Sequence, residues 1–301
     1  MRTKQVLRKY VRRTVFGVSL WIVASASATA VELFHIHGLG FSADGKRLYV
    51  PAHYGLVLYE DGRWRRASGQ EHDYMGFVTT REAMYSSGHP AQGSNLVNPF
   101  GLMKSRDQGA TWMNLGMQGE ADFHVLAASH DTGVVFVNNL GPNSRISWTG
   151  LAVTSDDGKT WQRPKQAGFP TQPIAIAVHP KRTMLVAAAA EDGLFLSQDG
   201  GNTFEHRIGR IGVYGLWFDL DGQSLWYGGI AFSPFLAKLD LSTQKTQYFE
   251  LPEIGRDAVA YIAQNPINKN EYAIATFGRD VYLSSEGGKK WRQLARQGET
   301  L

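Results

Sequence analysis

The sequence predicts an all-β protein, a six-bladed β-propeller with four-stranded antiparallel blades. Its 33 glycines and 12% aromatic residues suit many short strands joined by tight turns. A short phrase recurs along the chain with a spacing of 43 to 49 residues, which is typical of propeller blades or solenoid repeats. Each unit reads as four short strands, and a closed ring of six units leaves no long exposed sheet edge.

The repeated phrase is an apolar strand that starts at a glycine and ends in an acidic turn before an aromatic residue. Residues 101–105 (GLMKS) lead in this way to Asp107 and Trp112. The acids of the successive copies stand 46, 49, 43 and 87 residues apart, at Asp61, Asp107, Asp156, Asp199 and Glu286. The last step is two periods long, so we expect a degenerate copy at residues 235–240 (FLAKLD).

The first unit illustrates the assignment of four strands. Its apolar runs predict strands at residues 35–41, 47–52, 56–59 and 63–67. Turn-forming residues, such as those at 43–45 (ADG), separate these runs. The later units follow the same order.

The phrase S/T-x-D-x-G-x-T-W resembles the Asp box, or BNR repeat, of sialidases, sortilin-type receptor domains and many exported bacterial propellers. The resemblance covers nearly all of residues 31–301, in four full copies and a partial first one. It implies a propeller of this glycosyl-hydrolase-like superfamily and little about activity. In such a turn the carboxylate accepts backbone N–H groups, glycine takes a positive φ and the aromatic residue packs between blades. We therefore expect structural roles for Asp107, Asp156, Asp199 and Glu286.

Residues 1–30 have the three-part layout of a secretory signal peptide, so we expect residues 31–301 to form a single propeller domain. A basic head precedes an apolar run at residues 14–24, and small residues at 25–30 (SASATA) offer cleavage sites. The apolar run is shorter than the roughly 20 residues that span a bilayer. We expect export to the periplasm or the cell exterior, with an uncleaved membrane anchor as the alternative.

Charge and cysteine content exclude several classes of partner and site. Residues 1–30 hold six of the 31 Lys and Arg residues and none of the 27 Asp and Glu residues, so 25 basic residues face 27 acidic ones in the remainder. This balance gives no case for nucleic-acid binding. Because the chain has no cysteine, any metal site must use His, carboxylate or Met ligands. We expect a monomer without a nucleotide cofactor.

Six of the nine histidines fall at two equivalent points of the repeat. One point is the segment that leads into the innermost strand, and the other is the end of the second strand. In a propeller both points lie on one face, where ligand sites surround the central channel. The six are His35, His37, His53, His72, His89 and His124. We expect the other three, His130, His179 and His206, to be surface residues away from this face.

Six imidazoles on one face of blades one to three predict a transition-metal site for copper or zinc. Such a site needs three or four imidazoles, with carboxylates as ligands or as partners that orient the rings. Asp73 and Asp122 lie close in sequence to these histidines, and Met75 adds a soft donor that would favour copper. The alternative is a set of half-buried histidines hydrogen-bonded to neighbouring loops.

Two other functions remain open. Long connections at residues 86–100 and 138–149 are rich in Asn, Ser and Gly, which suits a saccharide or another small polar ligand. The resemblance allows a glycosyl-hydrolase-like enzyme, but the sialidase phrase FRIP is replaced by residues 34–37 (FHIH), which argues against a true sialidase. Candidate groups for a glycosidase are Tyr74, Tyr214, Tyr261, Asp73, Glu120, Asp122, Asp192, Asp257, Arg145, Arg210, Arg256 and Arg279. The third reading is an assembly scaffold whose propeller face docks a partner protein.

Overall fold

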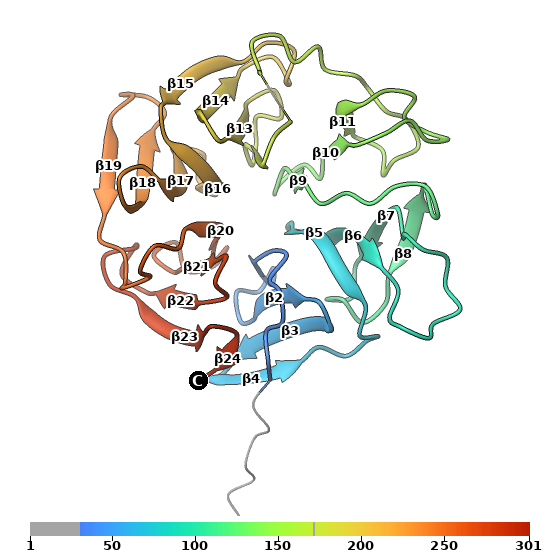
Figure 1. The fold of residues 1–301 in the computed structure, drawn as a ribbon, viewed down its shortest axis with the longest axis horizontal. Coiled ribbons are helices and arrows are strands. Elements are labelled where there is room, and N and C mark those ends of the chain that lie inside the picture. The colour runs from blue at the N-terminus through green and yellow to red at the C-terminus, as the bar shows by residue number, and fades with distance from the viewer. Residues whose placement is uncertain (1–30, 171) are drawn as a thin grey trace, which may run out of the picture.

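The computed structural model describes residues 31–170 and 172–301, and the predicted signal peptide lies outside this range. The described residues form six antiparallel sheets arranged as the blades of a β-propeller (Figure 1). The fold class predicted from the repeat is therefore confirmed. Among the described residues, no helix has the length and apolar character needed to cross a membrane.

Blades one to three are built from the following strands. Blade one contains β1 (Gly40–Phe41), β2 (Leu48–Ala52), β3 (Gly55–Glu60) and β4 (Arg63–Arg66). Blade two contains β5 (Asp73–Thr79), β6 (Met84–His89), β7 (Leu102–Ser105) and β8 (Met113–Gly116). Blade three contains β9 (Leu126–Ala128), β10 (Val135–Asn139) and β11 (Gly150–Thr154).

The remaining three blades follow the same order. Blade four contains β12 (Ala175–Val178), β13 (Val186–Ala190), β14 (Gly193–Ser197) and β15 (Glu205–Gly209). Blade five contains β16 (Gly212–Phe218), β17 (Ser224–Ile230), β18 (Pro234–Asp240) and β19 (Thr246–Phe249). Blade six contains β20 (Val259–Gln264), β21 (Tyr272–Thr276), β22 (Val281–Ser284), β23 (Arg292–Arg296) and β24 (Glu299–Thr300).

Blade three departs from the expected four strands. Its fourth position is occupied only by an isolated bridge between Val153 and Gln162. Pro164 follows two residues later, and proline cannot donate a hydrogen bond to a neighbouring strand. The outer edge of this blade is therefore short.

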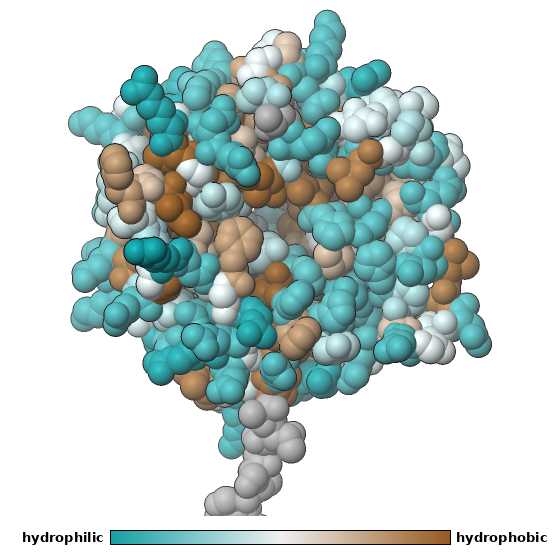
Figure 2. All heavy atoms as spheres, in the orientation of Figure 1, coloured by the Kyte–Doolittle hydropathy of each residue, from teal (hydrophilic) through white to brown (hydrophobic). Residues whose placement is uncertain are grey.

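The first strand of each blade is innermost, and the first strands contact one another around the axis. We call upper face the side that carries the segments leading into these strands and the connections between the second and third strands. An axial cavity runs between the inner strands, with walls that include Leu39, Leu126, Ile176 and Tyr261. Figure 2 shows one face of the disc, where apolar atoms gather around the hollowed centre and hydrophilic atoms cover the rim.

The core lies between blades rather than within one layer. Each of the core clusters in the described ranges joins two neighbouring blades. The aromatic residues of the repeated phrase take part, with Trp112 between blades one and two and Trp161 between blades two and three. Phe204 and Trp291 occupy the corresponding places in blades four and six. The expected packing of these residues between blades is found in the structure.

The acidic turns of the repeat are held by their own side chains. In the turn after β11, the Asp156 carboxylate accepts hydrogen bonds from the Thr160 backbone N–H at 2.9 Å and its hydroxyl at 2.7 Å. Gly158, with a φ of 77°, donates its N–H to the Thr154 hydroxyl at 3.0 Å. Asp107 and Asp199 make the equivalent contacts, whereas no carboxylate contact of this kind is found for Glu286 in the described chain.

Candidate metal centre

Two groups of imidazole and carboxylate side chains lie on the upper face of blades one to three. We call His37, His53 and Asp73 the first group, and His89, Asp122 and His124 the second group. Within each group, one potential ligand atom per residue lies within 4.8 Å of the others. Five of the six predicted histidines therefore lie in or beside these groups, as described below.

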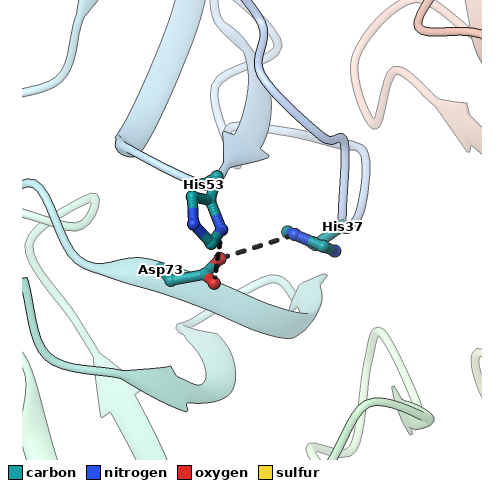
Figure 3. A group of neighbouring side chains, drawn as sticks. All are labelled: His37, His53 and Asp73. Carbon is teal, nitrogen blue, oxygen red and sulfur yellow. Dashed lines mark ion pairs between the residues drawn. The ribbon is translucent and has the colours of Figure 1, made fainter.

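The first group joins blades one and two (Figure 3). One oxygen of the Asp73 carboxylate, Oδ2, lies 2.8 Å from His53 Nδ1. The other oxygen, Oδ1, lies 3.4 Å from His37 Nε2. Backbone bonds hold the two histidines in place: His37 N–H donates to Pro51 O at 3.0 Å, and His53 N–H donates to Phe34 O at 2.7 Å. Because Asp73 starts β5, the innermost strand of the next blade, the packing of blade two against blade one brings it to these histidines.

Two buried polar atoms of the first group have no hydrogen-bond partner among the described residues. They are His37 Nε2 and Asp73 Oδ1, the two atoms that face each other. Their separation of 3.4 Å is longer than the 2.7–3.2 Å of an ordinary N–H···O bond. Burial lowers the pKa of His37, and His35, His124 and His53 act in the same direction against the raising effect of Asp73. A lowered pKa favours the neutral imidazole, which is the form that binds metals.

The second group joins blades two and three. One oxygen of Asp122, Oδ2, lies 2.6 Å from His124 Nε2 and 3.0 Å from His89 Nε2. Ser87 supports the segment that carries Asp122, because its hydroxyl donates to Gly101 O at 2.7 Å and accepts the Phe123 N–H at 2.9 Å. On its other side, the His89 ring places Nδ1 2.7 Å from the Asn98 side-chain oxygen.

The electrostatics of the second group follow from the shared carboxylate. The hydrogen bond to Asp122 raises the pKa of His124, against the opposing effect of partial burial. Burial alone would raise the pKa of Asp122, but the hydrogen bond and charge of His124 and the charge of His89 outweigh it and lower this pKa. Asp122 is therefore an ionised carboxylate at neutral pH.

His35 lies beside the first group without belonging to it. Its ring stacks on Phe34 at a centroid distance of 5.1 Å and stands 5.8 Å from the ring of His53 and 6.1 Å from that of His37. The strand expected at residues 35–41 is shortened to Gly40–Phe41. His35 has a left-handed φ of 56°, so a turn rather than a strand brings its ring to that of His37.

The structure does not bring His72 or Met75 into either group. His72 is 6% exposed, accepts the Ala91 N–H on Nδ1 at 2.9 Å and packs edge-on against Phe100 at 4.8 Å. The buried His72 side chain therefore holds the connection between β6 and β7 in place, which is a structural role. Met75 is buried within β5 opposite Ser87.

The three remaining histidines lie away from both groups, but not all are on the surface as expected. His179 is 3% exposed, accepts backbone N–H groups of Lys181 and Arg182 on Nδ1 and contacts Gly222 O through Nε2 at 3.0 Å. It closes the turn between β12 and β13. His130 is half-buried beside Asp131, and His206 is exposed on β15.

Sequence reasoning missed Ser87 and Asn98, which orient the second group. Both lie near His89, and their role depends on the fold of the connection between β6 and β7. Among the proposed glycosidase groups, Tyr74 is excluded as a surface nucleophile because its ring is buried against Trp112. Burial raises the pKa of Tyr74 to about 12. Tyr214 and Tyr261 line the axial cavity together with His37 and His124.

Comparison with known proteins identifies the fold. No family model and no curated protein matches this chain. The crystal structure of a GH74 enzyme from Niastella koreensis is similar over 88% of this chain and 47% of that chain, at 15% identity and a TM-score of 0.57. The extracellular domain of a one-component system from B. thetaiotaomicron covers 90% of this chain at 13% identity, with a TM-score of 0.55 over 34% of its own length.

A third similar structure is an ancestral GH74 enzyme, at 11% identity and a TM-score of 0.54, over 88% of this chain and 39% of that chain. The chain thus spans between about a third and about half of the length of these proteins. At such low identities the similarity shows the β-propeller fold and nothing about the chemistry of this protein.

Proposed function

We propose that the protein binds a transition-metal ion, copper or zinc, through the first group on its upper face. The observation that carries this proposal is the pair of buried, unpartnered atoms, His37 Nε2 and Asp73 Oδ1. A buried polar atom without a partner costs about 1–3 kcal/mol. A cation bound by both atoms and by His53 would remove that cost.

The donor set fits these metals. Two imidazoles and one carboxylate suit zinc and copper, whereas calcium and magnesium prefer oxygen ligands throughout. Three protein ligands leave a position for water or a small molecule, which is the arrangement of catalytic and transfer sites. When bound, the ion would supply Lewis-acid or redox chemistry beside the axial cavity that His37 lines. The chain's own residues hold the ion, and the half-buried Asp73 provides the negative charge.

The test is metal analysis of untagged protein. We expect protein from its own host to contain copper or zinc, and stripped protein to take up the ion on titration. Replacing both His37 and His53 by alanine removes two of three ligands. The metal affinity should fall by more than the 10–100-fold that is typical when a residue hydrogen-bonded to a metal ligand is removed.

His206→Ala is the matched control, because His206 is exposed on β15, in blade four, away from both groups. It should leave metal uptake unchanged. Thermal melting of the stripped double variant should show that it is folded. If untagged protein contains no transition metal and takes up none on titration, the proposal is wrong.

A glycosyl-hydrolase-like activity is the second candidate, favoured by two carboxylates, Asp73 and Asp122, on the upper face. Such enzymes need one carboxyl group that stays protonated and donates its proton. The lowered pKa of Asp122 argues against that role, and each carboxylate already contacts two imidazoles. Turnover of a glycoside panel that survives chelation would support this candidate over the metal site.

A docking role for the upper face is the third candidate. Several exposed apolar side chains lie on this face, in the segments leading into the blades and the connections between second and third strands: Phe34, Tyr54, Leu96, Val97, Leu140, Phe232 and Phe277. A pull-down that recovers one stable partner, and loses it with Tyr54→Asp and Phe277→Asp, would support a scaffold. We further propose that the protein is exported and is an Asp-box propeller, on the resemblance of its repeat and its leader.

A further inference from the structure

The propeller repeat places the same His–Asp pair at two successive blade boundaries. At the first boundary, His53 follows β2 and contacts Asp73, which starts β5, at 2.8 Å. At the second boundary, His89 ends β6 and contacts Asp122, which precedes β9, at 3.0 Å. A third imidazole completes each group, His37 in the first and His124 in the second. The second boundary thus repeats the His–Asp pair of the first, but its third imidazole comes from the other side: His37 lies on the blade of His53, whereas His124 lies beside Asp122.

The six side chains form two centres rather than one cage. The ligand atoms lie within 4.8 Å of one another in each group, and the described residues yield two such groups instead of a single larger one. The groups are nevertheless neighbours. Asp73 of the first group is the direct β-ladder partner of His89 of the second, and the Cβ atoms of such partners lie roughly 5 Å apart. His37 and His124 line the same axial cavity.

The hydrogen bond of His89 prepares the second group for a cation. The Asn98 oxygen can only accept, so His89 Nδ1 carries the proton that joins the two side chains. Nε2 lies on the other side of the ring, 3.0 Å from Asp122 Oδ2, the oxygen that His124 Nε2 also contacts. A metal-binding histidine has this arrangement, in which one ring nitrogen donates to an outer partner and the other faces the metal.

We propose that the second group holds a second transition-metal ion, so that the chain binds two ions at neighbouring centres on the upper face. This inference rests on the proposed function and extends it from one ion to two. His89, His124 and Asp122 bind the second ion, and Asn98 orients His89. The half-exposed His124 makes this centre the more accessible of the two, since its side chain is 52% exposed against 18% for His37.

The experiment is a titration of untagged, stripped protein with Cu²⁺, followed by gel filtration, elemental analysis and electron paramagnetic resonance. We expect two ions per chain, with a spectrum broadened by the interaction between two nearby copper centres. His89→Ala with His124→Ala should retain one ion and show the spectrum of an isolated centre. His37→Ala with His53→Ala should retain only the ion of the second group. His206→Ala should retain both ions.

Asn98→Leu tests the orienting role without removing a ligand. We expect it to weaken binding of the second ion by about 10–100-fold and to leave the first unchanged. One ion per chain in the wild type, lost in both double variants, would show a single shared site and overturn this inference. One ion that depends on the first group alone would also overturn it while leaving the proposed function intact. No uptake at all would overturn the proposed function itself.

Discussion

At the scale of single residues, carboxylates that accept several donors organise this propeller. Asp73 and Asp122 each contact two imidazoles at the upper face. Between blades five and six, the Asp219 carboxylate accepts the Trp226 indole N–H and the Tyr272 hydroxyl, both at 2.8 Å, and pairs with Lys238 at 2.5 Å. Asp219 is 3% exposed, so these partners replace the water that it loses on folding.

We predict that Asp219→Ala destabilises the protein by about 3 kcal/mol, because it leaves buried donors and a cation without their acceptor. Denaturant unfolding measures the change. Asp221→Ala is the matched control, since this neighbouring carboxylate is exposed and accepts the Gln223 N–H at 2.8 Å, so its loss should cost about 1 kcal/mol or less. Equal effects of the two substitutions would contradict the role given to Asp219.

At the scale of elements, the acidic turns carry the repeat. Hydrogen bonds from Thr111, Thr160 and Thr203 lower the pKa values of Asp107, Asp156 and Asp199, that of Asp156 to about 2. The degenerate copy also has a carboxylate that accepts backbone N–H groups of its turn. Asp240, at the end of β18, accepts those of Ser242 and Thr243. These contacts also lower its pKa to about 2.

The lowered pKa values make stability fall at acid pH. Each carboxylate binds its proton more weakly in the folded chain, so its contribution is present above the unfolded pKa of about 4 and is lost as pH falls toward 2. We expect the melting temperature to fall across this window. A triple variant, Asp107→Asn with Asp156→Asn and Asp199→Asn, should have a flatter profile between pH 4 and pH 2, as measured by calorimetry. An unchanged slope would exclude these turns as its source.

At the scale of the whole molecule, the two ends of the described chain close the ring. Glu32 pairs with Glu299 in β24, and the Leu33 N–H donates to Gly298 O at 2.7 Å. Leu33 is fully buried in the core cluster between blades one and six. This closure also positions His37, because the segment that passes through Leu33 leads directly to it.

We predict that Leu33→Ala destabilises the protein by about 3 kcal/mol, the cost of lost apolar contact and a cavity. Phe34→Ala is the control, because Phe34 is 37% exposed and should cost much less. Denaturant unfolding compares the two. Because the segment through Leu33 leads to His37, Leu33→Ala should also weaken metal binding, and full affinity of this variant would contradict the link between closure and the first group.

The sequence by itself determined the architecture of this protein. Glycines, acids and aromatic residues at a regular spacing encode local turns and strands, and each copy repeats the same short-range contacts. The predicted propeller is therefore confirmed, although Pro164 shortens blade three in a way that the repeat did not reveal. The period also indicated which histidines share the upper face, since equivalent positions of a repeat lie at equivalent places in a ring.

Only the tertiary structure decided how those histidines are used. His72 turns into the core to hold a loop, His35 approaches His37 through a left-handed turn, and the remaining imidazoles divide between two carboxylates. The pairing of His53 with Asp73, and of His89 with Asp122, joins different blades. Such contacts depend on strand register and on how neighbouring blades pack. Both result from many weak interactions between residues far apart in the sequence, so no local motif predicts them.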